Sequence, residues 1–161
     1  MGQSLAVSPT LDIDIDSLTI RDKILSIEES ISRLPEAMVG DCYPLVHKFV
    51  PGMYIREITM PPGHLIVSKI HKIEHPYFVL KGDVSVLTED GVVRIKAPYS
   101  GITKAGTKRV LYIHEETVWT TIHKTDETEM DKIEEEIIAK NFNDLELDII
   151  EITNFIEEVS L

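Results

Sequence analysis

The sequence is poor in cysteine, in positive charge and in long apolar runs. Its one cysteine, Cys42, cannot form an internal disulfide, which excludes a disulfide-stapled secreted scaffold. Only 16 Lys and Arg residues stand against 28 Asp and Glu residues, for a formal charge of -12, so a basic face for nucleic acid or an anionic membrane is not expected. No run approaches the roughly 20 apolar residues of a membrane span, and the first residues lack the basic and apolar regions of a signal peptide. We therefore expect a soluble protein without a nucleic-acid partner or membrane insertion.

What is present suits one globular domain with two arms. The chain has 161 residues, of which 43% are hydrophobic. The middle zone, residues 42–124, consists of short β-rich runs separated by turn residues, with no helical period between them. This pattern favours a closed β roll over a βαβ sheet. The runs are 53–60, 64–71, 77–81, 84–88, 92–96, 108–113 and 118–123, and the turns between them include 82–83, 89–91, 97–101 and 104–107.

The N-terminal arm, residues 1–41, is expected to contain a helix over about 18–34. Ser17 and Thr19 can cap it, and Pro35 ends it. Its apolar residues recur at alternating spacings of four and three, which forms one narrow stripe: Ile20, Ile24, Ile27, Ile31 and Leu34. The stripe can pack on the barrel or against a partner subunit, so these five residues are interface candidates.

The C-terminal arm, residues 125–161, is expected to form a helix followed by an acidic tail. Asp126 can cap a helix in which Met130, Ile133 and Ile137 share a face. The tail is too apolar to be merely solvated, since it carries Ile152, Phe155 and Ile156 among others. It must bury these side chains on its own barrel or on a neighbour, so they are interface candidates as well.

The residues with the most chemical potential lie in the run His71-Lys72-Ile73-Glu74-His75-Pro76. The spacing His71-x-x-Glu74-His75 matches the zinc protease pattern in which both histidines share one face of a helix. Strand-like residues precede this run and Pro76 follows it, so a continuous helix is not expected. We therefore reject the protease interpretation.

The same stretch resembles the first motif of the cupin superfamily, which has two histidines two positions apart, then a glutamate and a glycine. Those positions hold Lys69, His71, His75 and Gly82, after the Pro62-Gly63 turn. The second cupin motif, Pro-x-Gly-x-x-His, corresponds to residues 104–109 and ends in Arg109. The resemblance implies a mainly β, single cupin-type jelly roll (double-stranded β-helix), with a helix at each end and an acidic tail.

The departures from the cupin motifs bear on the metal that many members of the superfamily hold. The resemblance implies three imidazoles and a carboxylate as ligands, but only His71 and His75 remain in register. Lys69 and Arg109 would repel a divalent cation, although Glu74 or His123 could supplement the pair. We expect no cofactor, with a divalent transition metal on His71 and His75 as the alternative. The pocket candidates are Lys69, His71, Glu74, His75, Arg109 and His123, and a metal-free pocket could bind an anion through Lys69 and Arg109.

Roughly residues 43–140 also resemble small cupin-like proteins encoded by tailed phages and prophages, through PGMYIREITMPPG, SKIHKIEHPYFVLKGDVSV, GTKRVLYI and TVWTTIHKTDETE. This resemblance implies a non-enzymatic interaction or structural subunit, in a homo-oligomer or with other phage proteins. The expected location is the host cytoplasm during infection or the virion. The alternative is a small-molecule or metal-binding cupin enzyme of the isomerase or dioxygenase type, so an enzymatic activity stays open, and no catalytic residue is assigned.

Overall fold

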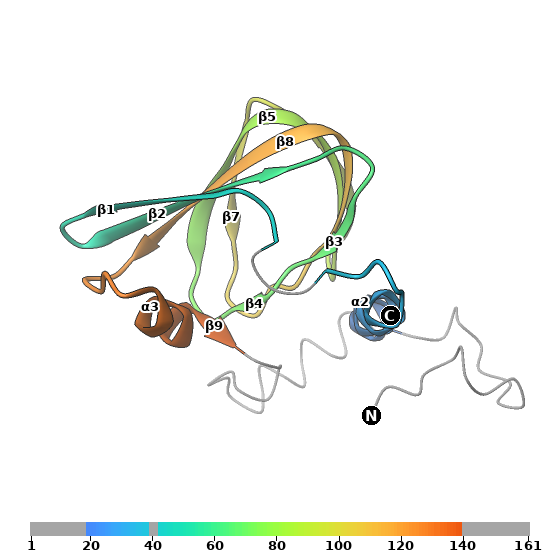
Figure 1. Cartoon of the computed structure of the whole chain (residues 1–161), viewed down its shortest axis with the longest axis horizontal. Helices are drawn as coiled ribbons and strands as arrows, with labels where there is room; N and C mark the ends of the chain where they lie inside the picture. The colour runs from blue at the N-terminus through green and yellow to red at the C-terminus, as the bar shows by residue number, and fades with distance from the viewer. Residues whose placement is uncertain (1–18, 39–41, 140–161) are drawn as a thin grey trace, which may run out of the picture.

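A computed structural model describes residues 19–38 and 42–139 (Figure 1). Its helices are α2 (Ile20–Ser32) and α3 (Met130–Ile137). Its strands are β1 (Leu45–Val50), β2 (Met53–Met60), β3 (Leu65–Val67), β4 (Ile70–His71), β5 (His75–Thr88), β6 (Gly91–Lys96), β7 (Tyr99–Thr103), β8 (Val110–Lys124) and β9 (Ile138–Ala139). None of the helices in these two ranges is both long and apolar enough to cross a bilayer.

The two longest strands, β5 and β8, organise the fold. They pair antiparallel, and the sheet runs in the order β1-β2-β8-β5-β6. β7 pairs with the first part of β5, and β3 pairs with the first part of β8. The strands curl around a common interior, and the β1–β2 hairpin projects from one side (Figure 1). This arrangement confirms the predicted class, a mainly β cupin-type jelly roll with a helix on each side.

Gly82 bends β5 in its middle and does not end it. The sequence predicts a turn at 82–83 between two strands, but β5 is continuous there and its register to β8 shifts between Val79 and Val84. Gly82 has a φ of 110°, and a Cβ at this position would lie 2.6 Å from the Thr117 Cα atom. Glycine therefore allows the strand to bend and the two backbones to approach closely. As a result, the first part of β5 pairs with β7 and the second part pairs with β6.

Further strand predictions need correction at three places. The expected strand 64–71 is divided into β3 and β4. The expected turn at 97–101 includes the start of β7, and the runs 108–113 and 118–123 belong to the single strand β8. The predicted hairpin at Asp90-Gly91 is confirmed, because Thr88 pairs with Gly91 at the end of β5 and β6.

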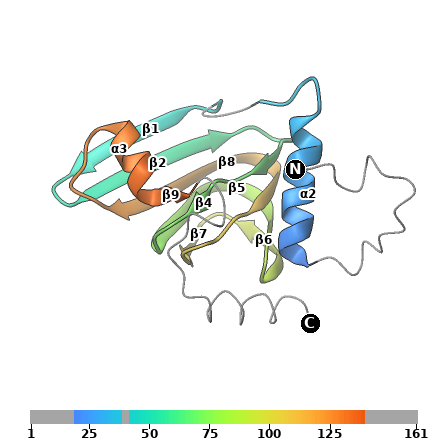
Figure 2. The ribbon, with the colours of Figure 1, turned by 90° about the horizontal axis from the view of Figure 1, so that it is seen from below.

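Two apolar cores lie on the inner faces of the sheet. The larger fills the roll and consists of Met60, Tyr77, Val79, Val84, Val86, Ile95, Leu111, Ile113 and Trp119. The smaller joins the β1–β2 hairpin to α3 through Tyr54, Ile133 and Ile137. In Figure 2, α3 lies against this hairpin, while α2 lies at the opposite end of the molecule. The histidines of the predicted pocket lie between these two cores.

α2 packs on its own barrel. Thr19 forms a capping box with Asp22 at its N-terminus, and Ile24 is fully buried. Arg21 forms an ion pair with Glu89 in the β5–β6 turn at 2.7 Å, and Lys108 bonds Glu28 at 2.9 Å. Ile24 is therefore not available to a partner, which corrects its place among the interface candidates. Ile20, Ile27 and Ile31 are half-buried, whereas Leu34 is exposed and lies beyond the helix.

α3 confirms the predicted C-terminal helix but begins later than expected. Its N-cap residue is Glu129, and no side chain caps it, so Asp126 does not have the predicted role. Ile133 and Ile137 are buried, but Met130 is exposed and does not share their packing. The tail candidates Ile152, Phe155 and Ile156 lie outside the described residues.

Candidate functional site

Three histidines meet at one end of the roll. His71 lies in β4, His75 begins β5, and His123 lies near the end of β8. The ring centroids of His71 and His75 are 4.6 Å apart, those of His75 and His123 are 4.3 Å apart, and those of His71 and His123 are 6.0 Å apart. We call these three residues the histidine cluster.

The alternation of the strands turns these side chains inward. Tyr77 of β5 pairs with Thr121 of β8, so His75 and His123, each two residues away, share the inner face with them. His75 and His123 are each 3% exposed. β9 closes the cluster on another side, because Ile138 pairs with His71. His71 itself is half-buried.

Burial keeps the cluster neutral. Desolvation lowers the pKa of His71 to about 2 and that of His123 to about 3, and it also lowers the pKa of His75. The positive charges of Arg56 and Arg109 add to the depression at His71. All three imidazoles are therefore uncharged at neutral pH, and each retains one ring nitrogen with a lone pair.

The tautomer of His75 follows from its hydrogen bond. Its Nδ1 lies 2.9 Å from the carbonyl oxygen of Ile73, which can only accept, so Nδ1 carries the proton. In a neutral ring Nε2 is then a bare acceptor. This Nε2 is buried and has no hydrogen-bond partner among the described residues, and the same is true of Nδ1 of His71. Unpartnered buried polar atoms are rare in folded proteins and often mark functional sites.

Arg109 places a positive charge beside the cluster. It is 7% exposed, and its guanidinium lies over the rings of Tyr77 and Trp119, 5.0 and 5.5 Å from their centroids. One of its terminal nitrogens donates to Oγ1 of Thr103 at 2.6 Å. Within residues 19–38 and 42–139, no carboxylate forms an ion pair with this guanidinium. Desolvation lowers the pKa of Arg109 accordingly.

The structure brings together four of the six predicted pocket residues, namely His71, His75, Arg109 and His123. Lys69 does not point into the barrel, because it forms an ion pair with Glu134 on α3. Glu74 is exposed in the connection between β4 and β5. The prediction for Lys69 assumed an unbroken strand over 64–71, and the break after β3 turns Lys69 toward the surface.

Sequence reasoning did not assign Thr103, Tyr77 or Arg56 to the site. Thr103 was missed because its strand, β7, was expected to be a turn. Tyr77 could have been found from alternation, since it lies two residues from His75 on the same strand. Arg56 lies in β2, whose pairing partner at this position is Thr121. That pairing could not be read from the sequence.

The residues do not fit the four-ligand metal set that the cupin resemblance implies. Two of the four positions hold Lys69 and Arg109, and Lys69 is engaged with α3. Nε2 of His123 is bonded to Oγ1 of Thr121 at 2.9 Å. Among the described residues, no group of three or more His, Cys, Asp or Glu side chains is arranged to hold a metal ion. The buried charge of Arg109 would also oppose a divalent cation at this place.

Comparisons with known proteins give only distant structural likenesses. No family model and no curated protein matches the sequence. Similar solved structures include a protein from Neisseria meningitidis (11% identity, 62% of this chain and 96% of that chain, TM-score 0.45). A cupin domain from Bordetella pertussis has 17% identity over 55% of this chain and 98% of that chain, with a TM-score of 0.42. An acetylacetone dioxygenase from Acinetobacter johnsonii has 22% identity over 51% of this chain and 58% of that chain, also with a TM-score of 0.42.

Proposed function

We propose that this protein binds a small organic anion at the end of the roll that holds the histidine cluster. The carboxylate of the ligand would bind Arg109. The observation that supports the proposal most strongly is the buried guanidinium without a carboxylate partner among the described residues. A guanidinium presents five N–H donors in a planar fork that matches a carboxylate. Thr103 accepts a hydrogen bond from only one nitrogen of the Arg109 guanidinium.

The energetics favour an anion over other ligands. Burying an unpaired charge costs several kcal/mol even after relaxation, and the contacts with Tyr77 and Trp119 offset about 1–2 kcal/mol each. An anion would neutralise the remaining charge. A divalent metal would add to it, because Arg56 also acts on the cluster with the same sign. We assign no reaction to the site.

Isothermal titration calorimetry with propionate tests the proposal. Metal content is first measured in the purified protein, which is then treated with EDTA. We expect saturable binding to wild type and its loss in Arg109→Met. The matched control is Arg94→Met, which removes a surface guanidinium that is paired with Asp83 on the outside of the sheet. Binding that survives Arg109→Met, or that requires a stoichiometric metal, would refute the proposal.

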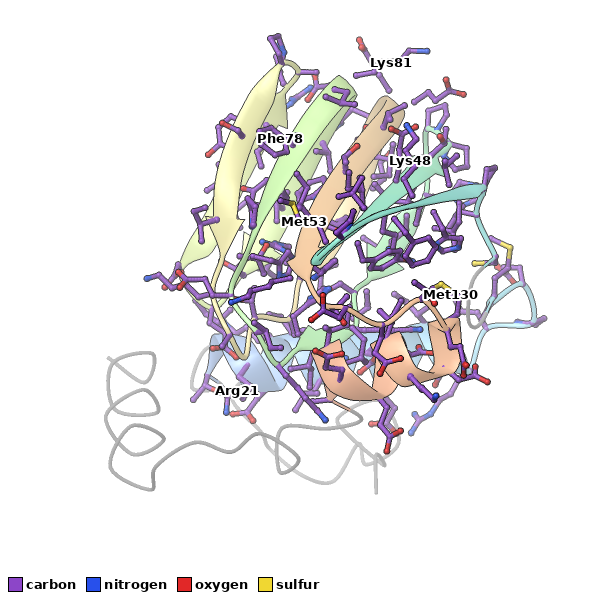
Figure 3. The ribbon with its side chains drawn as sticks, turned by 90° about the vertical axis from the view of Figure 1, so that its left-hand side faces the viewer. Arg21, Lys48, Met53, Phe78, Lys81 and Met130 are labelled. Carbon is purple, nitrogen blue, oxygen red and sulfur yellow. The ribbon has the colours of Figure 1, made fainter. Side chains whose placement is uncertain are left out.

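A second candidate function is that of an interaction subunit, which the outer face of the sheet favours. Strand alternation places six exposed apolar side chains on this face, across β1, β2, β5 and β7: Val46, Val50, Met53, Phe78, Leu80 and Ile102. Leu80 and Ile102 are 57% and 60% exposed. Figure 3 views this sheet from β7 to the β1–β2 hairpin, with Phe78, Met53 and Lys48 labelled. We call these six residues the outer apolar face.

The occupant that we propose for the outer apolar face is a second copy of this chain. A chain with a net charge of -12 repels its own copies, so two copies approach at least cost where charges are few. Lys48 and Glu57 lie on this face with opposite signs, and a two-fold axis can bring such charges across from one another. The chain would then be a subunit of a homo-oligomer or of a phage assembly, as the resemblance of residues 43–140 implies.

Analytical ultracentrifugation tests this second candidate. We expect a dimer for wild type and a monomer for the double variant Leu80→Glu, Ile102→Glu. The control is Val92→Glu on β6, an apolar position that is 71% exposed and is not part of the outer apolar face. A wild-type monomer at micromolar concentration, or a dimer that the double variant leaves intact, would rule out the outer apolar face as the contact.

A further inference from the structure

We infer that the ligand is a hydroxy acid, whose hydroxyl donates to Nε2 of His75 while its carboxylate binds Arg109. This inference rests on the proposed anion-binding function and specifies the class of ligand. Its own observation is the tautomer of His75: Nδ1 donates to Ile73, and the buried Nε2 is left as an acceptor without a donor in residues 19–38 and 42–139. A carboxylate alone cannot satisfy it, because a carboxylate has no proton to donate.

The acceptor and the cation both neighbour Thr103. His75 and Thr103 are paired neighbours in the β5–β7 ladder, and Arg109 donates to the hydroxyl of Thr103 at 2.6 Å. The charge of Arg109 also lowers the pKa of His75, as expected for groups close in space. One small molecule with a carboxylate and a neighbouring donor therefore matches both groups.

The charge of the site selects a hydroxyl over an amine as that donor. An amino acid carries an ammonium group at neutral pH. Arg109 and Arg56 already depress the pKa of His71, and Arg56 also depresses that of His123. A third cation beside them would be repelled, whereas a neutral hydroxyl would not.

Lactate and propionate differ by this one hydroxyl, so their affinities for the wild-type protein test the inference directly. Calorimetry on EDTA-treated protein removes any preference that arises from metal chelation. We expect lactate to bind at least about tenfold more tightly, because propionate leaves Nε2 of His75 buried and unpaired. Equal affinities would overturn the hydroxy-acid inference and leave the anion-binding function standing. If neither ligand binds, both fall.

The variant His75→Phe tests whether His75 accepts the hydrogen bond from the ligand hydroxyl. We expect lactate affinity to fall to the level of propionate, while propionate affinity changes less than about threefold. His64→Phe is the control, since this ring is bonded to Tyr43 outside the histidine cluster, and it should keep the preference for lactate. An equal loss for both ligands in His75→Phe would assign His75 a structural role only. If His75→Phe does not fold, the wild-type ligand pair still decides.

Discussion

Arg109 is the residue at which burial and charge oppose each other most strongly. Lys108, its neighbour in sequence, is also buried, but Lys108 pairs with Glu28 on α2. Arg109 has two aromatic faces and one hydroxyl instead. Two adjacent buried cations are therefore stabilised by different kinds of contact. The contacts of Arg109 include no carboxylate among the described residues, and the proposed anion site rests on this difference.

This opposition predicts that Arg109→Met does not destabilise the ligand-free protein. The variant removes an unpaired buried charge and keeps the apolar stem, so we expect the free energy of unfolding to stay equal or to rise by up to about 2 kcal/mol. Urea denaturation measures the change. A loss of more than about 1 kcal/mol would show that the guanidinium mainly holds Tyr77 and Trp119 in place.

At the scale of the elements, the candidate site depends on the course of β5. Its first part carries His75 and Tyr77 beside β7, and its second part pairs with β6. The bend at Gly82 joins the two parts. Without it the strand would continue straight, and the roll would not close around Arg109.

The bend predicts a sharp difference between two glycine substitutions. Gly82 and Gly63 both have positive φ. A Cβ at Gly82 would meet the Thr117 backbone, whereas no atom of the described residues lies within 4 Å of a Cβ at Gly63. Gly63→Ala should cost about 1–2 kcal/mol for backbone strain alone. Gly82→Ala should cost clearly more, or prevent folding, in thermal unfolding measured by circular dichroism. Equal costs for the two variants would contradict the close approach of β5 and β8.

The sequence predicts the elements better than their connections. Alternation and turn residues locate most of the strands from 53 onward, and spacing locates both helices. The continuity of β5 through Gly82-Asp83 could not be predicted, because the same two residues suit a turn. β7 was missed for a similar reason, since Pro98 directly precedes it and Gly101 lies within it. The missed β7 kept Thr103 out of the predicted site, and the unbroken strand expected over 64–71 put Lys69 into it.

At the scale of the whole molecule, the histidine cluster and Arg109 together contact the two cores. The ring of Tyr54, from the smaller core, stacks on His123 at 5.8 Å, and Tyr77, from the larger core, contacts Arg109. The sequence predicted the roll and the proximity of His71, His75 and Arg109 through the cupin resemblance. It also named His123 as a pocket candidate, but not the pairing of β8 with β5 that brings His123 to His75.

The neutral cluster predicts that the protein loses stability in mild acid. The folded-state pKa values of His71 and His123, about 2 and about 3, lie below the ordinary value of 6.5, so the unfolded chain binds more protons between these limits. Stability therefore falls as the pH drops below about 6.5, by at most about 1.4 kcal/mol per pH unit for each histidine.

Urea denaturation at several pH values between 7 and 4.5 measures this slope. His123→Gln should reduce it by about one proton, because the variant has one fewer buried imidazole to charge on unfolding. A slope that is the same in wild type and His123→Gln would mean that His123 titrates alike in the folded and unfolded states.

The charge at the inner end of the barrel can be observed directly through the side-chain Nε–H resonance of Arg109. The resonance is assigned by its absence from the spectrum of Arg109→Met, in nitrogen-edited NMR of the EDTA-treated protein. Our account predicts that lactate shifts this resonance saturably while the Arg94 resonance stays in place. An Arg109 resonance that does not respond to lactate or propionate at millimolar concentration would contradict the account.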